Sequence, residues 1–152
     1  MAHIEDEMIS RDDINEAEGI ILSAGYGKSF SYGGGAENGP SRTVECFCNH
    51  LEAFDRFLYK EVYRSLDIGH HILNGINELS PEKMVEMISN FYIENKKKFI
   101  MILGGDHSVS IGAFDAISKI HSPAEVTILQ IDAHPDLRDT PSDYKEGAGK
   151  FD

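Results

Sequence analysis

Acidic and imidazole side chains follow two apolar segments of this chain. The segment QIDAHPDLRD places Asp132, His134 and Asp136 at alternate positions, and the upstream segment GGDHS contributes His107. Successive side chains of an extended backbone point to opposite sides, so the three alternate residues start from a common side. The pattern predicts a group of oxygen and nitrogen donors at one edge of the molecule.

Two carboxylates and two imidazoles form a ligand set that suits manganese, with iron(II), cobalt and zinc as alternatives. Asp132 lies centrally and is the natural bridge between two ions. Each residue also has a simpler interpretation: His107 as a hydrogen-bonded core histidine, and Asp136 as an ion-pair partner of Arg138. For Asp106 we prefer a helix-capping role over ligation. The convergence of four candidates at two strand ends favours the metal site.

The elements that must position these residues follow from hydrophobic periodicity. Apolar runs predict buried strands, and spacings of three and four residues predict helices. The expected strands are 19–27, 61–69, 99–103 and 125–132, and the expected helices are 41–58, 80–98 and 108–120.

Strands that alternate with helices predict a three-layer α/β fold, with a mostly parallel sheet covered by helices on both faces. Ligands of such sheets bind beyond the carboxyl ends of the strands, where both donor groups lie. We expect 99–103 and 125–132 to be neighbouring strands, since consecutive parallel strands often are. Gly104 and Gly105 should let the backbone turn sharply there.

Composition and charge argue against some classes of function. The formal net charge is −12, which argues against a nucleic-acid partner. No apolar run is long enough to cross a bilayer, and the first residues lack the pattern of a secretory signal, so we expect a cytoplasmic protein. We expect residues 1–18 to form an acidic arm and residues 19–152 to form one α/β domain. Cys46 and Cys48, near His50, make no zinc motif without a second pair of ligands.

The segments LGGDHSVS and QIDAHPDLRD resemble two signature motifs of the ureohydrolase family, the arginases and agmatinases. SYGGGAENGP resembles the glycine-rich N-terminal loop of that family, and the resemblance covers about residues 20–139. It implies an arginase-like fold that holds two manganese ions and hydrolyses a guanidinium group to release urea. By position, it implies that His107 and Asp136 bind the first ion, that His134 binds the second, and that Asp132 bridges both. Catalytic residues beyond these ligands, and substrate-binding residues, stay unassigned.

The N-terminal part reads more like agmatinases than arginases, so the resemblance favours agmatine as the substrate, with putrescine and urea as products. It also implies a homo-oligomer that acts in polyamine biosynthesis.

The chain departs from the family after Arg138. The family completes both metal shells with a later Asp-x-Asp motif and uses a further histidine for proton transfer, and neither follows here. We therefore expect the N-terminal half of a ureohydrolase, apparently truncated at the C-terminus. The alternative is a non-catalytic relic that binds metal weakly or acts as an interaction module. A deacetylase-like metal hydrolase would fit the Asp-x-His pair but not GGDHS.

Overall fold

The apolar strand Gly19–Ala24 (β1) lies at the centre of a parallel sheet. It pairs on one side with Ile68–Ile72 (β4) and on the other with Phe99–Gly104 (β5), in the order β4-β1-β5. The computed structural model describes residues 13–28, 33–50, 54–61 and 67–134, with the backbone alone at 48–50. All three strands run parallel because each connection between them crosses over a face of the sheet.

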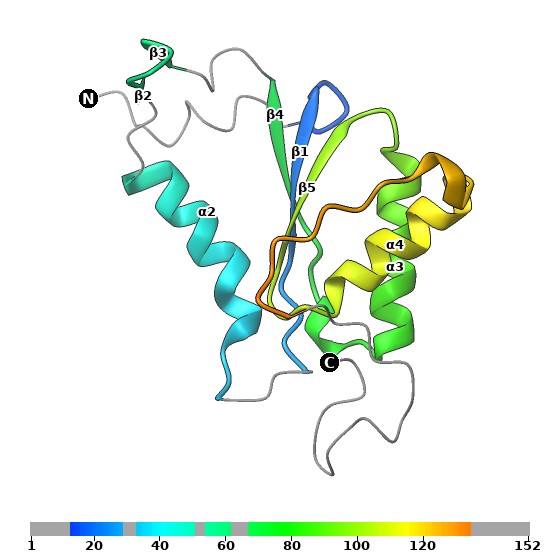
Figure 1. Ribbon diagram of the computed structural model, residues 1–152. Coiled ribbons are helices and arrows are strands. Elements are labelled where there is room, and N and C mark those ends of the chain that lie inside the picture. The colour runs from blue at the N-terminus through cyan, green and yellow to red at the C-terminus, as the bar shows by residue number, and fades with distance from the viewer. Residues whose placement is uncertain (1–12, 29–32, 51–53, 62–66, 135–152) are drawn as a thin grey trace.

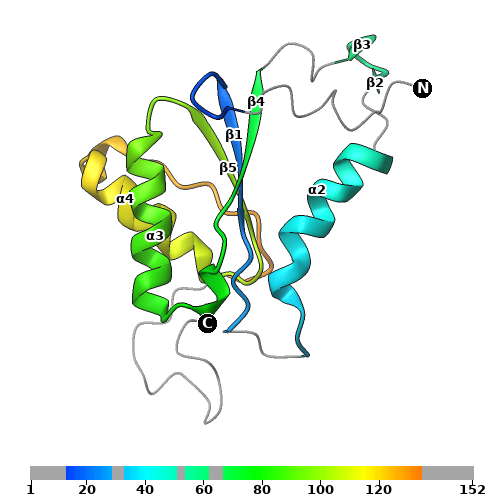
Figure 2. The same cartoon turned by 180° about the vertical axis from the view of Figure 1, so that it is seen from behind.

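Helices cover both faces of this sheet. They are α2 (Gly39–His50), α3 (Pro81–Glu94) and α4 (Val109–Ile120), with short 3-10 turns at Ala36–Asn38, Ile76–Glu78 and Pro123–Glu125. Helix α2 lies on one side of the strands, and α3 and α4 lie on the other (Figures 1 and 2). The predicted α/β class with a parallel central sheet is confirmed. Among the described helices, none is both long and apolar enough to span a membrane.

The core lies between the sheet and α3. Ile20 and Leu22 of β1 are fully buried, and they belong to one cluster with Met84 and Ile88 of α3. Helix α4 packs closely on α3 at Gly112, where a Cβ would lie only 2.6 Å from the Cβ of Ile88. Each of these large side chains contributes about 1.5–3 kcal/mol through burial, so this layer dominates the stability of the fold.

The helix α3 begins where its sequence predicts but ends at Glu94, four residues before the predicted end at 98. The Ser80 side chain accepts a hydrogen bond from the Lys83 backbone N–H at 3.5 Å, and Pro81 occupies the first turn. In α4 the buried positions are Val109, Gly112 and Ala116, and the close contact with α3 turns the glycine inward.

The helix predicted over 41–58 is wrong in its second part. Helix α2 ends at His50, and Phe54–Asp55 (β2) pairs in antiparallel fashion with Lys60–Glu61 (β3). The Asp55 carboxylate accepts hydrogen bonds from the backbone N–H groups of Phe57 and Leu58, within the connecting turn, at 2.8 and 2.9 Å. Such side-chain bonds compete with helical ones, and Tyr59 then adopts a left-handed φ of 54°. The strand expected at 61–69 begins later, as β4.

The strand predicted over 125–132 is also wrong. After the short turn at Pro123–Glu125 the backbone is extended, with φ −110° and ψ 131° at Val126, but no ladder forms within the described part of the chain. Leu129 is 86% exposed and Ile131 is 92% exposed. The backbone is therefore extended here, as the sequence predicts, but it pairs with no other strand among the described residues.

Part of the expected N-terminal arm contacts the domain. Ala17 is buried, and Ile14 packs against the core and lies close to Gly69 of β4. The Lys98 ammonium donates hydrogen bonds to the backbone carbonyls of Ile14, Asn15 and Ala17 at 2.5, 2.8 and 2.7 Å. Lys98 therefore holds residues 14–17 against the start of β5 and does not cap α3.

Candidate metal centre

The loop that follows β5 is built around two glycines. The Gly105 N–H donates to the Ala24 carbonyl at 3.3 Å, and the Asp106 N–H donates to the Tyr26 carbonyl at 2.8 Å. A Cβ on Gly105 would overlap the Tyr26 carbonyl oxygen and would lie 2.8 Å from that of Ala36. The glycine is thus required by close backbone approach. The sequence predicted that Gly104 and Gly105 provide conformational freedom for a sharp turn. This reason was wrong, because the glycines with left-handed φ in the described chain lie elsewhere.

Asp106 caps the turn that leads into α4, whose N-cap residue is Ser108. One carboxylate oxygen of Asp106 accepts hydrogen bonds from the backbone N–H of Ser108 at 3.0 Å and from the Ser108 hydroxyl at 2.5 Å. These bonds fit the preferred role at the start of the helix, and the preference over ligation stays a prediction. The turn holds the backbone on both sides of His107.

Three of the four predicted ligands lie in the described part of the chain. The His107 Nδ1 is 4.0 Å from Asp132 Oδ2, and the His134 Nδ1 is 3.8 Å from Asp132 Oδ1. Each imidazole therefore faces a different oxygen of the same carboxylate. Asp136, the fourth predicted ligand, lies outside the described residues.

The donor atoms fit the requirements of divalent ions in their chemistry and their separation. Imidazole nitrogen and carboxylate oxygen bind an ion such as zinc at about 2.0–2.2 Å, so two donors on one ion lie within about 4.4 Å of each other. Both nitrogen-to-oxygen separations are below this limit. Within the described ranges, however, no group of three or more His, Cys, Asp or Glu side chains is arranged to hold a metal ion.

The turn that carries Asp132 and His134 is held by local hydrogen bonds. The His134 N–H donates to Asp132 Oδ1 at 2.9 Å, and the Gln130 side-chain amide donates to the His134 carbonyl at 3.0 Å. The sequence predicted Asp132 at the end of a regular strand and His134 just beyond it, but side chain to backbone bonds position both residues instead. His107 and Asp132 still meet, although their segments are not paired strands.

Electrostatics keep Asp132 charged. The backbone hydrogen bond from His134 lowers the pKa of the Asp132 carboxyl, and the nearby imidazoles of His107 and His134 lower it further. The Asp132 side chain is 30% exposed, whereas both imidazoles are largely open to solvent. A deprotonated carboxylate between two accessible nitrogens is ready to bind a cation.

Tyr26 belongs to this region, although we did not single it out from the sequence. Its carbonyl receives the Asp106 N–H, and its phenolic oxygen is buried with no hydrogen-bond partner among the described residues. Burial raises the pKa of the Tyr26 phenol, and the charges of Asp106 and Glu82 raise it further. The signal available in the sequence was an aromatic residue between Gly25 and Gly27, directly after a buried strand.

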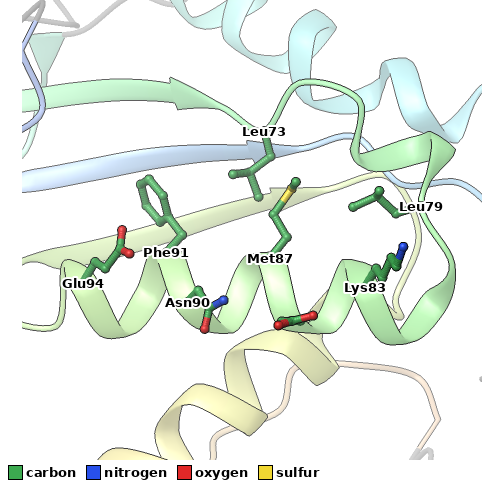
Figure 3. A pocket seen from close by; sticks show the side chains of 8 residues that line it. Leu73, Leu79, Lys83, Met87, Asn90, Phe91 and Glu94 are labelled. Atoms are coloured by element: carbon green, nitrogen blue, oxygen red, sulfur yellow. The ribbon is translucent and has the colours of Figure 1, made fainter.

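Two further features lie apart from the candidate metal centre. Cys46 is a free, exposed thiol on α2, and the side chains of Cys48 and His50 lie outside the described part. A surface hollow of about 470 Å³ lies along α3 (Figure 3). Its lining is mainly apolar, and it includes none of the candidate ligands. The lining includes Leu73, Leu79, Lys83, Met87, Phe91 and Glu94.

Known proteins resemble this chain in sequence and in fold. Residues 17–150 match the sequence model of the arginase family. The N(1)-aminopropylagmatine ureohydrolase of Synechocystis sp. is 28% identical over 82% of the chain and 42% of its own length. The agmatinase of Halalkalibacterium halodurans is 29% identical over 87% of the chain and 45% of its own length. The agmatine ureohydrolase structure of Thermoplasma volcanium superposes with a TM-score of 0.68 at 19% identity, over 95% of this chain and 46% of that one.

The chain thus spans less than half the length of these relatives. The matched part contains the sheet, the loop after β5 and the turn that carries Asp132. The predicted arginase-like, incomplete fold is confirmed by these matches. On the match over residues 17–150, this chain belongs to the arginase family.

Proposed function

We propose that this chain carries part of the metal site of a manganese-dependent ureohydrolase that converts agmatine to putrescine and urea. The observation that carries the proposal is the placement of two imidazoles on separate oxygens of Asp132, in a chain of the arginase family. Relatives named as agmatinases support agmatine over other guanidino compounds. The reaction would belong to cytoplasmic polyamine synthesis.

The residues of this chain have distinct roles in the proposal. His107 and Asp136 would hold one ion, His134 the other, and Asp132 both. Two divalent ions at such a site activate water near neutral pH and polarise the bond that is cleaved. Asp132 supplies the shared negative charge, and the turn bonded through His134 keeps its two oxygens directed to opposite partners.

Metal binding gives the first test. We expect purified chain to bind Mn²⁺ in an equilibrium titration followed by electron paramagnetic resonance, and Asp132→Ala to lose most of that binding. Asp115→Ala is the matched control, because Asp115 pairs with Lys119 on α4, away from the candidate ligands. Equal binding by wild type and Asp132→Ala would contradict the bridging role.

Urea release gives the second test. The 152-residue chain alone should release little or no urea from agmatine, arginine or guanidinobutyrate, since few ligands surround each ion and small misplacements are costly in rate. A chimera of residues 1–134 with the remaining part of the Halalkalibacterium agmatinase should prefer agmatine. Preference for arginine would overturn the substrate assignment.

A second candidate is the non-catalytic relic or interaction module. It is favoured by the fact that no group of three or more potential ligands in the described part of the chain is arranged to hold a metal ion. This candidate predicts weak or absent Mn²⁺ binding, unchanged by Asp132→Ala, and an inactive chimera.

A further inference from the structure

We propose that the β2–β3 hairpin of one chain inserts its tip into the surface hollow along α3 of a second copy of this chain. The tip consists of residues 56–60, at the end of the hairpin, and the hollow is the one shown in Figure 3. The proposal concerns the surfaces through which copies of the chain contact each other. It rests on neither the metal site nor the substrate proposed above.

The tip of the hairpin exposes three consecutive large side chains. Phe57 is fully exposed, and Leu58 and Tyr59 are each more than half exposed. Single apolar side chains on a surface are common, whereas apolar side chains that gather in solvent mark an interaction surface. The tip therefore has the composition of a contact region.

The conformation of the tip is fixed within the hairpin itself. The Asp55 carboxylate accepts hydrogen bonds from the backbone N–H groups of Phe57 and Leu58 at 2.8 and 2.9 Å. The Phe54 ring packs edge-on against the Tyr59 ring, with 5.4 Å between their centroids, and Tyr59 adopts a left-handed φ of 54°. A residue other than glycine keeps this conformation only where its surroundings enforce it. A tip that is already ordered loses little conformational entropy when it binds.

The hollow along α3 offers an apolar surface of suitable size. Figure 3 shows Met87 and Phe91 of α3 directed toward Leu73, and the volume is about 470 Å³. This volume falls in the range of pockets that enclose small ligands, so a side chain of the size of Phe57 fits within it. The Phe91 ring stacks on His71 of β4, with 4.8 Å between the ring centroids, and this contact holds the floor of the hollow in place.

Charges around the two surfaces are complementary. Arg56 and Lys60 are exposed on either side of the apolar residues of the tip. Glu86 and Glu94 are exposed at the hollow, together with Lys83. The basic side chains that flank the inserted residues would therefore meet a lining with an excess of acid. The formal net charge of −12 opposes association, but salt at about 0.15 M screens exposed charges that lie more than about 8 Å apart.

The tip of a chain does not reach the hollow of the same chain. In both views the hairpin lies on the α2 side of the strands, whereas α3 lies on the other side (Figures 1 and 2). Insertion must therefore join two copies. Because the tip and the hollow are different surfaces, the contact is head-to-tail, and it leaves one free tip and one free hollow on every dimer.

The experiment follows self-association of the 152-residue chain by analytical ultracentrifugation, between about 1 μM and 1 mM chain, with chelator and without substrate. Wild type should associate in this range. Phe57→Asp should weaken association about ten-fold or more, because it places a charge in the apolar contact. Asn90→Arg should have a similar effect, because it adds a long basic side chain at the exposed edge of the hollow.

Mixing the two variants gives the most specific readout. Phe57→Asp retains an intact hollow, and Asn90→Arg retains an intact tip, so an equimolar mixture should form a one-to-one dimer with an affinity close to that of wild type. This dimer should not grow further, since its remaining tip and hollow are both altered. Because metal and substrate are absent, failure here is distinct from failure of the proposed activity.

The matched control is Leu129→Asp, which also replaces an exposed apolar residue by an acid but belongs to neither surface. It should associate within about two-fold of wild type, and circular dichroism should show all three variants folded as wild type. The proposal is overturned if wild type remains monomeric throughout the range, or if Phe57→Asp and Leu129→Asp associate alike. It is also overturned if Asn90→Arg has no effect, or if the mixture forms no dimer, because either result would mean that the tip contacts another surface.

Discussion

β5 and the segment 126–131 are similar in sequence but differ in structure. FIMIL and VTILQI are both apolar runs that end beside a candidate metal ligand. β5 pairs with β1 over its whole length, and its Ile100 and Ile102 pack against the core. The segment 126–131 has the same backbone preference but no ladder among the described residues. An apolar run thus becomes a strand only where another backbone is available to pair with it, since an extended segment has no hydrogen bonds of its own.

The largest expected effect compares the loops after these two segments. Gly105→Val should destabilise the fold by about 3 kcal/mol or more, because the side chain would overlap the backbone carbonyls of Tyr26 and Ala36. Ala133→Val, in the exposed turn after 126–131, should change stability by less than about 0.5 kcal/mol. Urea denaturation measures both. Equal midpoints would mean that the loop after β5 is not tightly packed.

The next comparison concerns the isoleucines within the two runs. Ile102→Ala should cost about 1–3 kcal/mol, because this partly buried side chain packs on the core. Ile131→Ala should be close to neutral in the isolated chain, since Ile131 is almost fully exposed. The same denaturation curves check this pair. A large cost for Ile131→Ala would show that the exposed segment is packed in solution.

A smaller effect separates the two acidic residues near the ends of these runs. Asp106→Ala should lose about 0.5–2 kcal/mol of stability through loss of its bonds to Ser108, without removing a predicted ligand. Asp132→Ala should leave metal-free stability almost unchanged, because its carboxylate accepts from the His134 N–H within an exposed turn and its contact with the half-exposed His107 imidazole is 4.0 Å long. Thermal unfolding in chelator measures the difference. The comparison fails if Asp132→Ala is the more destabilising of the two.

The separation of two interacting residues along the chain decided whether the sequence could predict their interaction. The capping of α3 by Ser80 and of α4 by Asp106 was predictable, because each needs only residues two or three positions away. The hairpin after α2 was missed, because the bonds of Asp55 compete with helix formation within one turn. The absence of a strand at 126–132 could not be predicted, because strand formation depends on a partner that local periodicity does not specify.

The candidate site was likewise predicted only in part. The residue types and alternation around Asp132 predicted that His107 and His134 would lie near it, and both do. The predicted route, through neighbouring strands, was wrong, because a side-chain turn at Asp132 replaces the ladder. The buried Tyr26 was missed, since its place beneath the loop depends on contacts between β1 and β5 that are distant in sequence.

The smallest expected effect compares a histidine of the paired sheet with one of the exposed turn. His70 lies on β4, with its Nε2 2.8 Å from the Ser23 hydroxyl, and burial followed by the charge of His71 lowers its pKa below 6.5. The unfolded chain therefore binds this proton more readily than the folded chain does. Stability should fall as the pH drops below about 6.5.

Melting temperatures between pH 7.5 and 5 test this dependence. His70→Gln should flatten the decrease at low pH, because the amide can still bond to Ser23 but does not titrate in this range. His134→Gln, which replaces an exposed histidine of the turn, is measured alongside for comparison. Identical slopes for wild type and His70→Gln would contradict the assignment.

The attachment of residues 14–17 through Lys98 has a chemical consequence. The Lys98 nitrogen donates to three backbone carbonyls and is partly enclosed by them, so an acylating reagent must displace these bonds before it can reach the nitrogen. Lys96 and Lys97, which are exposed at the end of α3, should therefore be modified first, as peptide mass mapping can follow. Slow labelling of Lys98 would then report on whether the N-terminal segment remains attached to β5, and any treatment that releases this segment should make Lys98 as reactive as its neighbours.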